Sequence, residues 1–336
     1  MIARPRPRVL VALRPDGIPP PGLAGAGGDL ADFVFVRTAD EVLAGHNEVS
    51  AAFVWNFRST VIPQAIGRLP MLEWVHVAAS GVDASLSDEV RGRRVIVTNS
   101  RGVTAEAMAE YALALMLAVA KSLPVTLADQ RERRWTPRLS RMLAGRCLVT
   151  VGVGPVGRSL AAKATALGMR VIGIGRRAHP PGGGFERIDD ADRIREAFAE
   201  ADYVVAATPL TSETRGMIGR AELAALRRDA VLVNLGRGAV IDEPALVEAL
   251  AEERLGAACL DVFQQEPLPA ASPLWELPQV IVSPHMSSDF TGWEEAMVDL
   301  FIANLRRWRE GSPLANVVDL SLGYVAEAEP ALPAPP

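Results

Sequence analysis

The residues best suited to chemistry are Arg237, Glu266 and His285, because each lies past a short apolar run in the C-terminal half of the chain. Such runs are typical of buried parallel strands, and the carboxyl ends of parallel strands meet at one edge of a sheet, where doubly wound proteins bind ligands. We therefore expect the three side chains to converge on one crevice. It would hold a general acid or base beside a guanidinium and a carboxylate.

The other histidines are weaker candidates for acid–base chemistry. His46 lies in a polar stretch, His76 inside an apolar run and His179 in a loop rich in proline and glycine. We expect structural roles for all three, which leaves His285 as the candidate general acid or base.

A glycine-rich turn, GVGPVG at 152–157, follows an apolar run that ends at Val151 and precedes a helical pattern. In this setting Gly152 permits a tight turn, Gly154 lets the backbone approach a pyrophosphate, and Gly157 allows close packing of helix on strand. The N-terminus of the helix offers N–H groups to the anion. The pattern predicts a dinucleotide site.

The end of the next predicted strand indicates which dinucleotide binds. An NAD site commonly places an acidic residue there, about 20 residues after the glycines, to hold the ribose hydroxyls. Here the strand Arg170–Ile174 is followed by Gly175, Arg176 and Arg177. Two guanidinium groups suit a 2′-phosphate, which favours NADP(H) and leaves NAD(H) possible. The alternative is that one or both arginines project into solvent.

Apolar runs of four to six residues alternate with longer helical patterns, which predicts an α/β fold with two doubly wound parallel sheets. We expect a helix over Ser59–Leu69 and a long one capped by Thr104, with an apolar surface all round from Tyr111 to Ala120 that implies burial on every side. The predicted strands are Arg8–Leu13, Asp32–Val36, Ala51–Trp55, Trp74–Ala78, Val95–Thr98, Arg146–Val151, Arg170–Ile174, Tyr203–Ala206, Val231–Asn234, Ala257–Leu260 and Val280–Val282.

The composition is that of a folded protein of about two domains, with 336 residues of which 49% are hydrophobic and 22% charged. The 35 basic and 40 acidic residues give a net charge of −5, which offers no positive field for nucleic acid or an anionic membrane. The two cysteines lack metal-site or CxxC spacing, and the longest apolar run is too short to span a membrane. We expect no metal, nucleic-acid partner or membrane partner, and a cytoplasmic location.

Six ordered motifs resemble those of the D-isomer-specific 2-hydroxyacid dehydrogenases over nearly the whole chain. They are ASGVD at 79–83, TNSRGV at 98–103, GVGPVG at 152–157, NLGRG at 234–238, DVFQQEP at 261–267 and SPH at 283–285. The resemblance implies a Rossmann cofactor domain over 102–287. This domain would be inserted in a discontinuous, flavodoxin-like substrate domain made of 1–101 and 288–336.

The resemblance also implies NAD(P)H-dependent reduction of a 2-keto acid to a D-2-hydroxy acid by hydride transfer. Arg237 would bind the substrate carboxylate and polarise the C2 carbonyl. His285 would protonate the carbonyl oxygen, while Glu266 would orient the ring and favour its protonated form.

The remaining substrate contacts are expected from two loops in the first third of the chain. Backbone N–H groups of Ser80, Gly81 and Val82 would complete the anion pocket, and Arg58 would contact a second anionic group on the substrate. With an arginine pair after the second strand of the cofactor domain, the chain resembles NADP-dependent glyoxylate and hydroxypyruvate reductases more than the NAD-dependent members.

The family's cofactor contacts also match positions in this chain. Asp261 would hold the nicotinamide carboxamide, with a helix N-cap after its strand as the alternative. The full set of expected cofactor contacts is Thr104, Gly152, Gly154, Pro155, Val156, Gly157, Arg176, Arg177, Thr208, Pro209, Thr214, Leu235, Gly236 and Asp261.

Other functions stay open at this point. One is a dinucleotide-sensing binding protein that resembles the family's transcriptional corepressors, which retain the same Arg, Glu and His. Another is a relative of formate or phosphite dehydrogenases, although formate-type members carry Gln where Glu266 stands. The family further implies a homodimer formed through the cofactor domain, along the region from Thr104 to Trp135.

Overall fold

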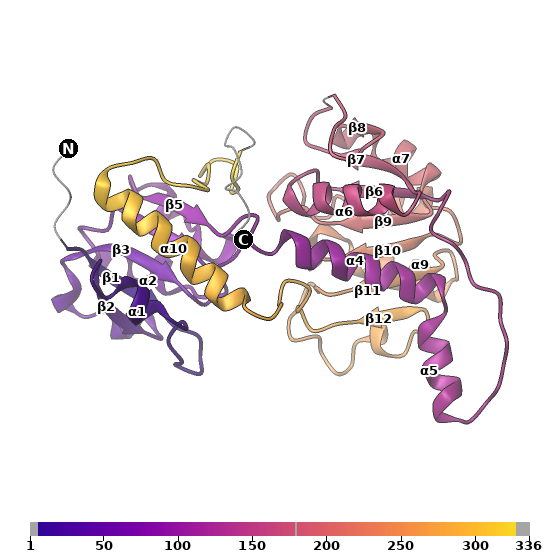
Figure 1. The fold of residues 1–336 in the computed structure, drawn as a ribbon, viewed down its shortest axis with the longest axis horizontal. Helices are drawn as coiled ribbons and strands as arrows, with labels where there is room; N and C mark the ends of the chain where they lie inside the picture. Colours follow the sequence, from indigo (N-terminus) through magenta and orange to yellow (C-terminus); the bar gives the residue numbers. More distant parts are fainter. Residues whose placement is uncertain (1–5, 179, 327–336) are drawn as a thin grey trace. The chain divides into compact units, whose positions relative to one another are not determined.

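A computed structural model describes residues 6–178 and 180–326 (Figure 1). The chain divides into two compact units. Unit 1 takes its described residues from Met1–Val103 and Phe290–Pro336, and unit 2 is Thr104–Asp289. These boundaries lie two residues beyond the expected ones at both junctions. His179, for which we expect a structural role, lies outside the described residues.

Unit 1 is built on a five-stranded sheet whose ladders are all parallel. Its strands are β1 (Arg8–Ala12), β2 (Asp32–Val36), β3 (Val49–Val54), β4 (Trp74–Val77) and β5 (Ile96–Asn99). The order β2-β1-β3-β4-β5 is that of flavodoxin-like folds. The α/β prediction is therefore confirmed for this unit.

Helices cover both faces of this sheet. They are α1 (Leu23–Gly27), α2 (Val61–Ala65), α3 (Asp88–Arg91) and α10 (Trp293–Glu310). The helix expected over Ser59–Leu69 forms as α2 followed by a 3-10 turn at Ile66–Arg68. The longest helix, α10, is not among the predicted elements.

The apolar face of α10 packs on the sheet of unit 1 (Figure 1). Phe301 stacks on Phe53 of β3 with ring centroids 4.2 Å apart and planes inclined by 3°. Both side chains are fully buried. Because burying a phenyl group stabilises a fold by about 1.5–3 kcal/mol, this C-terminal helix is an integral part of the core of unit 1.

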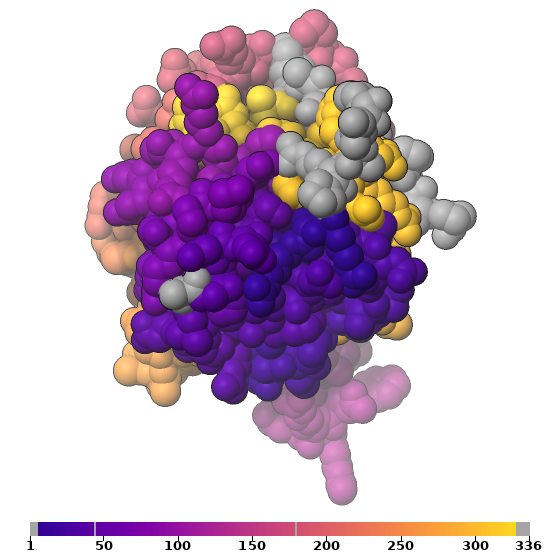
Figure 2. Space-filling model, turned by 90° about the vertical axis from the view of Figure 1, so that its left-hand side faces the viewer, coloured from indigo at the N-terminus to yellow at the C-terminus, as the bar shows by residue number. Residues whose placement is uncertain are grey.

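The segment after α10 lies along the outer edge of β5. Val317 forms an antiparallel bridge with Thr98, and the Val318 N–H donates to the Val97 carbonyl oxygen at 2.8 Å. Figure 2 shows the yellow atoms of this segment beside violet atoms from the first third of the chain. Unit 1 is thus completed by residues more than two hundred positions apart in sequence.

Unit 2 is built on a seven-stranded parallel sheet in the order β12-β11-β10-β9-β6-β7-β8. Its strands are β6 (Cys147–Val151), β7 (Arg170–Ile174), β8 (Arg187–Asp189), β9 (Tyr203–Ala206), β10 (Val231–Asn234), β11 (Ala257–Leu260) and β12 (Val280–Val282). The strand order reverses between β6 and β9, as in a Rossmann fold, and confirms the second predicted sheet. Only the short edge strand β8 was not predicted.

Unit 2 contains six α-helices in the described chain. They are α4 (Ala105–Ala120), α5 (Leu123–Arg131), α6 (Pro155–Ala166), α7 (Ile194–Glu200), α8 (Arg220–Ala225) and α9 (Glu243–Ala251). Among the described helices none alone is long and apolar enough to cross a membrane; α4 and α5 meet those criteria only as a pair, bent by 63°.

Two expectations for α4 are wrong. Thr104 occupies the N-cap position, but its hydroxyl does not cap the helix and contacts the Met108 sulfur at 3.6 Å. The helix is also not buried on every side: Met116 is fully buried, whereas Leu117 is 37% exposed. One face of α4 packs on α6 and the sheet. The opposite face is open to solvent although its residues are also apolar, so the composition of the helix did not reveal it.

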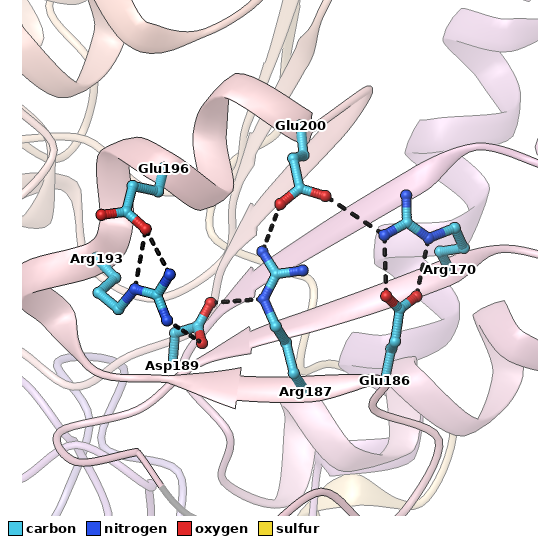
Figure 3. Close-up of polar contacts among 7 residues, drawn as sticks. All are labelled: Arg170, Glu186, Arg187, Asp189, Arg193, Glu196 and Glu200. Atoms are coloured by element: carbon cyan, nitrogen blue, oxygen red, sulfur yellow. Dashed lines mark hydrogen bonds and ion pairs between the residues drawn. The ribbon is translucent and has the colours of Figure 1, made fainter.

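A chain of ion pairs ties β8 to the rest of unit 2 (Figure 3). Arg187 of β8 binds Asp189 at 2.8 Å and Glu200 of α7 at 2.6 Å. Glu200 also contacts Arg170 of β7 at 3.3 Å, and Arg170 in turn binds Glu186 at 2.8 Å. These side chains add to the backbone pairing of a three-residue edge strand with β7.

Candidate functional site

The glycine-rich turn after β6 has the geometry that a bound pyrophosphate requires. Gly152 has a φ of 111°, and a Cβ there would lie 2.7 Å from the Ala207 carbonyl oxygen. A Cβ on Gly157 would lie 2.1 Å from the Gly152 oxygen, so both positions exclude a side chain. A Cβ on Gly154 would meet nothing within 4 Å, which leaves open space at the start of α6.

The first turn of α6 is not capped by a side chain. Gly154 is the N-cap residue and Pro155, which has no N–H, occupies the first helical position. Val156 and Gly157 follow in the same turn. An anion at this position would accept hydrogen bonds from the backbone N–H groups that a capping side chain would otherwise bind. The residues present therefore fit the dinucleotide that the sequence predicts.

The loops after β9 and β10 meet beside this turn. A Cβ on Gly236 would lie 2.7 Å from the Thr208 carbonyl oxygen, and the buried Leu235 donates its N–H to Ala206 at 3.0 Å. The Thr214 hydroxyl donates to the Pro209 carbonyl oxygen at 2.6 Å. Thr214 thus shapes the loop that follows β9, and a direct contact with the cofactor stays a prediction.

Arg176 and Arg177 follow β7 and are both exposed. The Arg176 Nε atom lies 3.5 Å from Oε2 of Glu213, a residue of the loop after β9. Glu213 is not among the predicted site residues. Arg176 thus has a carboxylate partner while both arginines are exposed, and a contact of either arginine with a 2′-phosphate stays a prediction.

Glu266 and His285 form a hydrogen-bonded pair at the carboxyl end of the sheet. The His285 Nδ1 atom lies 2.8 Å from Glu266 Oε2, and Glu266 Oε1 accepts the Phe263 N–H at 3.0 Å. The two side chains are 17% and 18% exposed. The carboxylate is therefore fixed on one side by backbone and presents its other oxygen to the Nδ1 atom of the imidazole.

Arg237 lies at the end of β10 in a braced turn. Asn234 accepts the Gly236 N–H on Oδ1 and donates from Nδ2 to the Arg237 carbonyl oxygen, both at 3.1 Å. A Cβ on Gly238 would lie 1.9 Å from the carbonyl carbon of Phe263. Because only glycine allows this contact, the loop that carries Arg237 packs directly on the loop that carries Glu266.

Asp261 is completely buried and holds the segment that contains His285. Its Oδ1 accepts hydrogen bonds from the Ser283 hydroxyl at 2.6 Å and the Met286 N–H at 3.0 Å, and its Oδ2 accepts the Ser287 N–H at 2.9 Å. In the described chain no helix begins at Asp261, because the next helical element after β11 is the 3-10 turn Pro273–Trp275, so the N-cap alternative is wrong. The contact with a nicotinamide carboxamide stays a prediction.

The other predicted substrate residues lie in unit 1. Ser80, Gly81 and Val82 follow β4, and the Ser80 carbonyl oxygen accepts a 2.6 Å hydrogen bond from the Asn99 amide. Arg58 is exposed after β3, with its guanidinium 5.1 Å from the centre of the Phe57 ring. The structure thus gives these loops a defined conformation, and their role in binding stays a prediction.

Sequence reasoning missed three residues that shape the site of unit 2. Asn234 and Ser283 act through hydrogen bonds to backbone or to a buried carboxylate, and Glu213 through an ion pair with Arg176. Asn234 belongs to the NLGRG motif and Ser283 to the SPH motif, and this signal could have found both. Within the described residues no group of three or more His, Cys, Asp or Glu side chains could hold a metal ion.

Known proteins share these features of sequence. A family model described as D-isomer specific 2-hydroxyacid dehydrogenase, NAD binding domain, matches residues 113–287. The glyoxylate reductase of Korarchaeum cryptofilum is 35% identical over 261 residues, which are 74% of this chain and 77% of that protein. The match therefore extends over most of both chains.

Solved structures share the fold. A D-isomer specific 2-hydroxyacid dehydrogenase from Xanthobacter autotrophicus Py2, in complex with NADPH and MES, is 32% identical, with a TM-score of 0.80 over 94% of this chain and 99% of that one. An NADPH-dependent glyoxylate/hydroxypyruvate reductase from Sinorhizobium meliloti, in complex with NADP and malonate, is 28% identical, with a TM-score of 0.80 over 97% and 100%. Both of these similar proteins were solved with an NADP cofactor bound.

Proposed function

Since the chain belongs to the D-isomer-specific 2-hydroxyacid dehydrogenase family, we propose that it reduces a small 2-keto acid to the D-2-hydroxy acid with NADPH. The observation that carries this proposal is the hydrogen bond between Glu266 and His285, at the same edge of the sheet as the phosphate-binding turn. This edge also carries Arg237. A general acid, its orienting carboxylate and a guanidinium for the substrate carboxylate are thus positioned by adjacent strands.

The turn Gly152–Gly157, the start of α6 and the loops after β9 and β10 would hold the cofactor. When bound, a reduced nicotinamide supplies a hydride to carbon C2 of the keto acid. Asp261 fixes the loop that carries His285, and its position at the end of β11 supports the proposed contact with the nicotinamide carboxamide.

Residues of unit 2 supply the proton and the charged groups that the reaction needs. His285 donates a proton from Nε2 to the carbonyl oxygen of the substrate, while Glu266 accepts the hydrogen bond from Nδ1 and neutralises the charged ring. Arg237 binds the substrate carboxylate through charge-assisted hydrogen bonds and polarises the carbonyl. The result is an alcohol at C2 and an oxidised cofactor.

The preference for NADPH over NADH rests on Arg176 and Arg177, which stand where NAD-binding proteins commonly carry an acidic residue. A guanidinium can bind a 2′-phosphate through two parallel hydrogen bonds. The NADPH- and NADP-bound structures of similar proteins support this assignment.

The substrate is a compact keto acid of the glyoxylate and hydroxypyruvate type. The similar protein from Korarchaeum cryptofilum is named a glyoxylate reductase, and the one from Sinorhizobium meliloti a glyoxylate/hydroxypyruvate reductase. In unit 1 we assign the backbone N–H groups of Ser80, Gly81 and Val82 to the substrate carboxylate, and Arg58 to a second anionic group.

The test is oxidation of NADPH and NADH, measured in parallel at about pH 6.5 with glyoxylate, hydroxypyruvate, pyruvate, 2-ketobutyrate and phenylpyruvate. We expect turnover with NADPH preferred, lost in His285→Ala. Preference for NADH would remove the assignment of Arg176 and Arg177 and leave the reaction intact. Binding of dinucleotide without turnover of any acid would favour a dinucleotide-sensing protein instead.

The protein is further proposed to act as a homodimer through the arm formed by α5 and residues 132–144, which projects from the sheet of unit 2 (Figure 1). Apolar side chains on this arm are open to solvent: Trp135 is 96% exposed, Leu139 100% and Met142 66%. Leu139 also lines a pocket of about 210 Å³ with Val119 and Tyr203. Exposed apolar side chains of this kind mark a surface that a partner covers, and a second copy is the occupant we propose.

Sedimentation of the full chain tests the dimer. We expect a mass about twice 35.9 kDa for the wild type, and a monomer for the double variant Trp135→Ser, Leu139→Asp. Met71→Asp is the matched control, because Met71 is 58% exposed in unit 1. A wild type that sediments as a monomer at micromolar concentration would contradict the dimer.

A reducing compartment such as the cytoplasm is the proposed location. Cys147 and Cys259 are both buried and unpaired, and burial raises the pKa of the Cys147 thiol to about 11 and that of Cys259 to about 12. Thiols of this kind are poor nucleophiles and need no oxidising environment.

A further inference from the structure

The ion pair between Arg176 and Glu213 spans the phosphate-binding turn. In the sheet of unit 2, β6 lies between β9 and β7, so the loops after β9 and β7 flank the turn that follows β6. Arg176 lies directly after β7 and Glu213 lies in the loop after β9. Their contact of 3.5 Å therefore joins the two sides of the crevice in which a dinucleotide binds.

The backbone at Glu213 is held in place by its neighbours. The Thr211 hydroxyl oxygen accepts the Glu213 N–H at 3.2 Å, and the Thr214 hydroxyl oxygen accepts the Thr211 N–H at 2.8 Å. The Thr214 hydroxyl donates to the Pro209 carbonyl oxygen. Glu213 thus extends its carboxylate toward Arg176 from a fixed base.

The ion pair itself is weak enough to exchange. The side chain of Arg176 is 46% exposed and that of Glu213 63% exposed, and exposed pairs of this kind contribute little to stability. A phosphate carries more charge than a carboxylate and offers three acceptor oxygens to a guanidinium. A 2′-phosphate can therefore replace Glu213 as the partner of Arg176.

We infer that Glu213 competes with the 2′-phosphate of NADP(H) for Arg176 and thereby sets how strongly the protein prefers NADPH over NADH. NADH carries a 2′-hydroxyl at this position and does not need to displace a carboxylate. Glu213 therefore weakens binding of NADPH selectively, because it occupies the guanidinium that the 2′-phosphate needs. The inference rests on the proposed NADPH preference and adds a specificity-determining residue to that site.

Binding of NADPH and of NADH to the full chain, measured by titration calorimetry without substrate, tests this inference. Glu213→Gln keeps the size of the side chain and removes its charge. We expect the Kd for NADPH to fall by about two- to fivefold and the Kd for NADH to stay unchanged, as for the loss of one exposed ion pair. The gain in affinity for NADPH should be smaller at about 500 mM salt than at about 20 mM salt, because salt screens exposed charges.

Two further variants separate competition from a change in net charge. Glu196→Gln makes the same charge change at an exposed glutamate of α7 that pairs with Arg193, and should leave both affinities unchanged. Arg176→Gln should weaken the binding of NADPH and leave the binding of NADH unchanged. Glu213→Gln should have no further effect in the Arg176→Gln background, because the competition needs the guanidinium.

The outcomes for Glu213 and for the proposed function are distinguishable. Preference of the wild type for NADPH, together with turnover of a keto acid, tests the proposed function alone. If NADPH binds more tightly to the wild type but Glu213→Gln leaves its Kd unchanged or raises it, the inference is overturned and the proposed function stands. An equal gain in the Arg176→Gln background would overturn it as well.

Discussion

Glu266 accepts one hydrogen bond from the backbone N–H of Phe263 and one from the imidazole of His285, each through a different oxygen. The carboxylate is thereby held by a hydrogen bond on each of its two oxygens. We expect Glu266→Gln to lower kcat by about 10–100-fold, since an amide offers one acceptor oxygen instead of two and no negative charge to the imidazole, a loss of about 1.5–3 kcal/mol. His285→Ala should lower kcat by about 10²–10⁴-fold, as for loss of a general acid.

Steady-state kinetics with NADPH and glyoxylate measure both effects. The KM for NADPH should change little, because neither side chain belongs to the phosphate-binding turn. Glu252→Gln, at an exposed glutamate after α9, is the charge control and should keep the wild-type kcat. Equal kcat values in Glu266→Gln and the wild type would exclude a role for the carboxylate in the reaction.

The second prediction concerns Asp261, which holds the backbone next to His285 rather than the imidazole ring. His285 has a φ of 55°, a left-handed conformation that costs energy in a residue with a Cβ, and the next two N–H groups donate to Asp261. Asp261→Ala would leave three donors without an acceptor, at a cost of about 1–3 kcal/mol for each buried group. We expect urea denaturation to show a free energy of unfolding that is lower by at least about 3 kcal/mol. We also expect kcat to fall in this variant.

The serine beneath this carboxylate separates stability from positioning. Ser283→Ala removes one donor and leaves the N–H groups of Met286 and Ser287 bound, so kcat should stay close to wild type while stability falls by about 1 kcal/mol. An Asp261→Ala variant with wild-type kcat at a temperature where it is folded would show that Asp261 does not position His285.

The sheets were predictable because their strands are buried on both faces. Tyr203–Ala206 and Val231–Asn234 each read as an uninterrupted apolar or neutral run, and both strands have the bounds expected from sequence. The glycine turn was predictable for a related reason. Gly152 and Gly157 lie where backbone atoms approach within 3 Å of a Cβ position, so the local sequence records the packing directly.

The parts that were missed depend on contacts between distant residues. β8 has no apolar run of its own, and its Arg187 pairs with Glu200 of α7, a contact that no local pattern reveals. The partners of Asp261 lie more than twenty positions along the chain. For α10 a pattern was present, since Met297, Phe301 and Leu305 recur at helical spacing on one buried face.

His76 makes a third prediction, on the dependence of stability on pH. Its ring is fully buried in unit 1, with Nδ1 2.8 Å from the Thr98 hydroxyl oxygen and Nε2 3.2 Å from that of Ser100. Burial lowers its pKa to about 3 from an ordinary value of 6.5. The hydroxyl of Ser100 donates to the Val77 carbonyl oxygen, so the neutral ring donates from Nε2 and accepts at Nδ1.

Because the unfolded chain binds a proton at His76 below about pH 6.5 and the folded chain does not, acid favours unfolding over this range. The loss is about 1.4 kcal/mol for each pH unit until the folded pKa is reached, which gives about 2 kcal/mol between pH 7 and pH 5. Urea unfolding of the wild type and of His76→Gln should show the slope in the first and a flatter dependence in the second. The same slope in His76→Gln would assign it to other groups, and His46→Gln serves as the control.

The ion pairs around β8 make the last prediction. Hydrogen bonds from Arg187 hold the pKa of Glu200 below its ordinary value of 4.5, and those from Arg170 do the same for Glu186. A carboxyl group whose pKa is depressed by folding stabilises the protein above its unfolded pKa, and this contribution is lost as pH falls below about 4.5. Since these side chains are substantially exposed, we expect Glu200→Gln to lower stability by no more than about 1 kcal/mol at neutral pH.

Thermal unfolding at about 20 mM and about 500 mM salt checks the cause of this loss. Screening should abolish most of the difference between Glu200→Gln and the wild type, because the side chains in both ion pairs of Glu200 (Figure 3) are partly exposed to solvent. Glu253→Gln, whose side chain is 82% exposed and pairs with Arg228 at 3.7 Å, should change nothing at either salt concentration. A loss in Glu200→Gln that persists at high salt would mean that packing of α7 on β8, rather than charge, keeps this edge strand in the sheet.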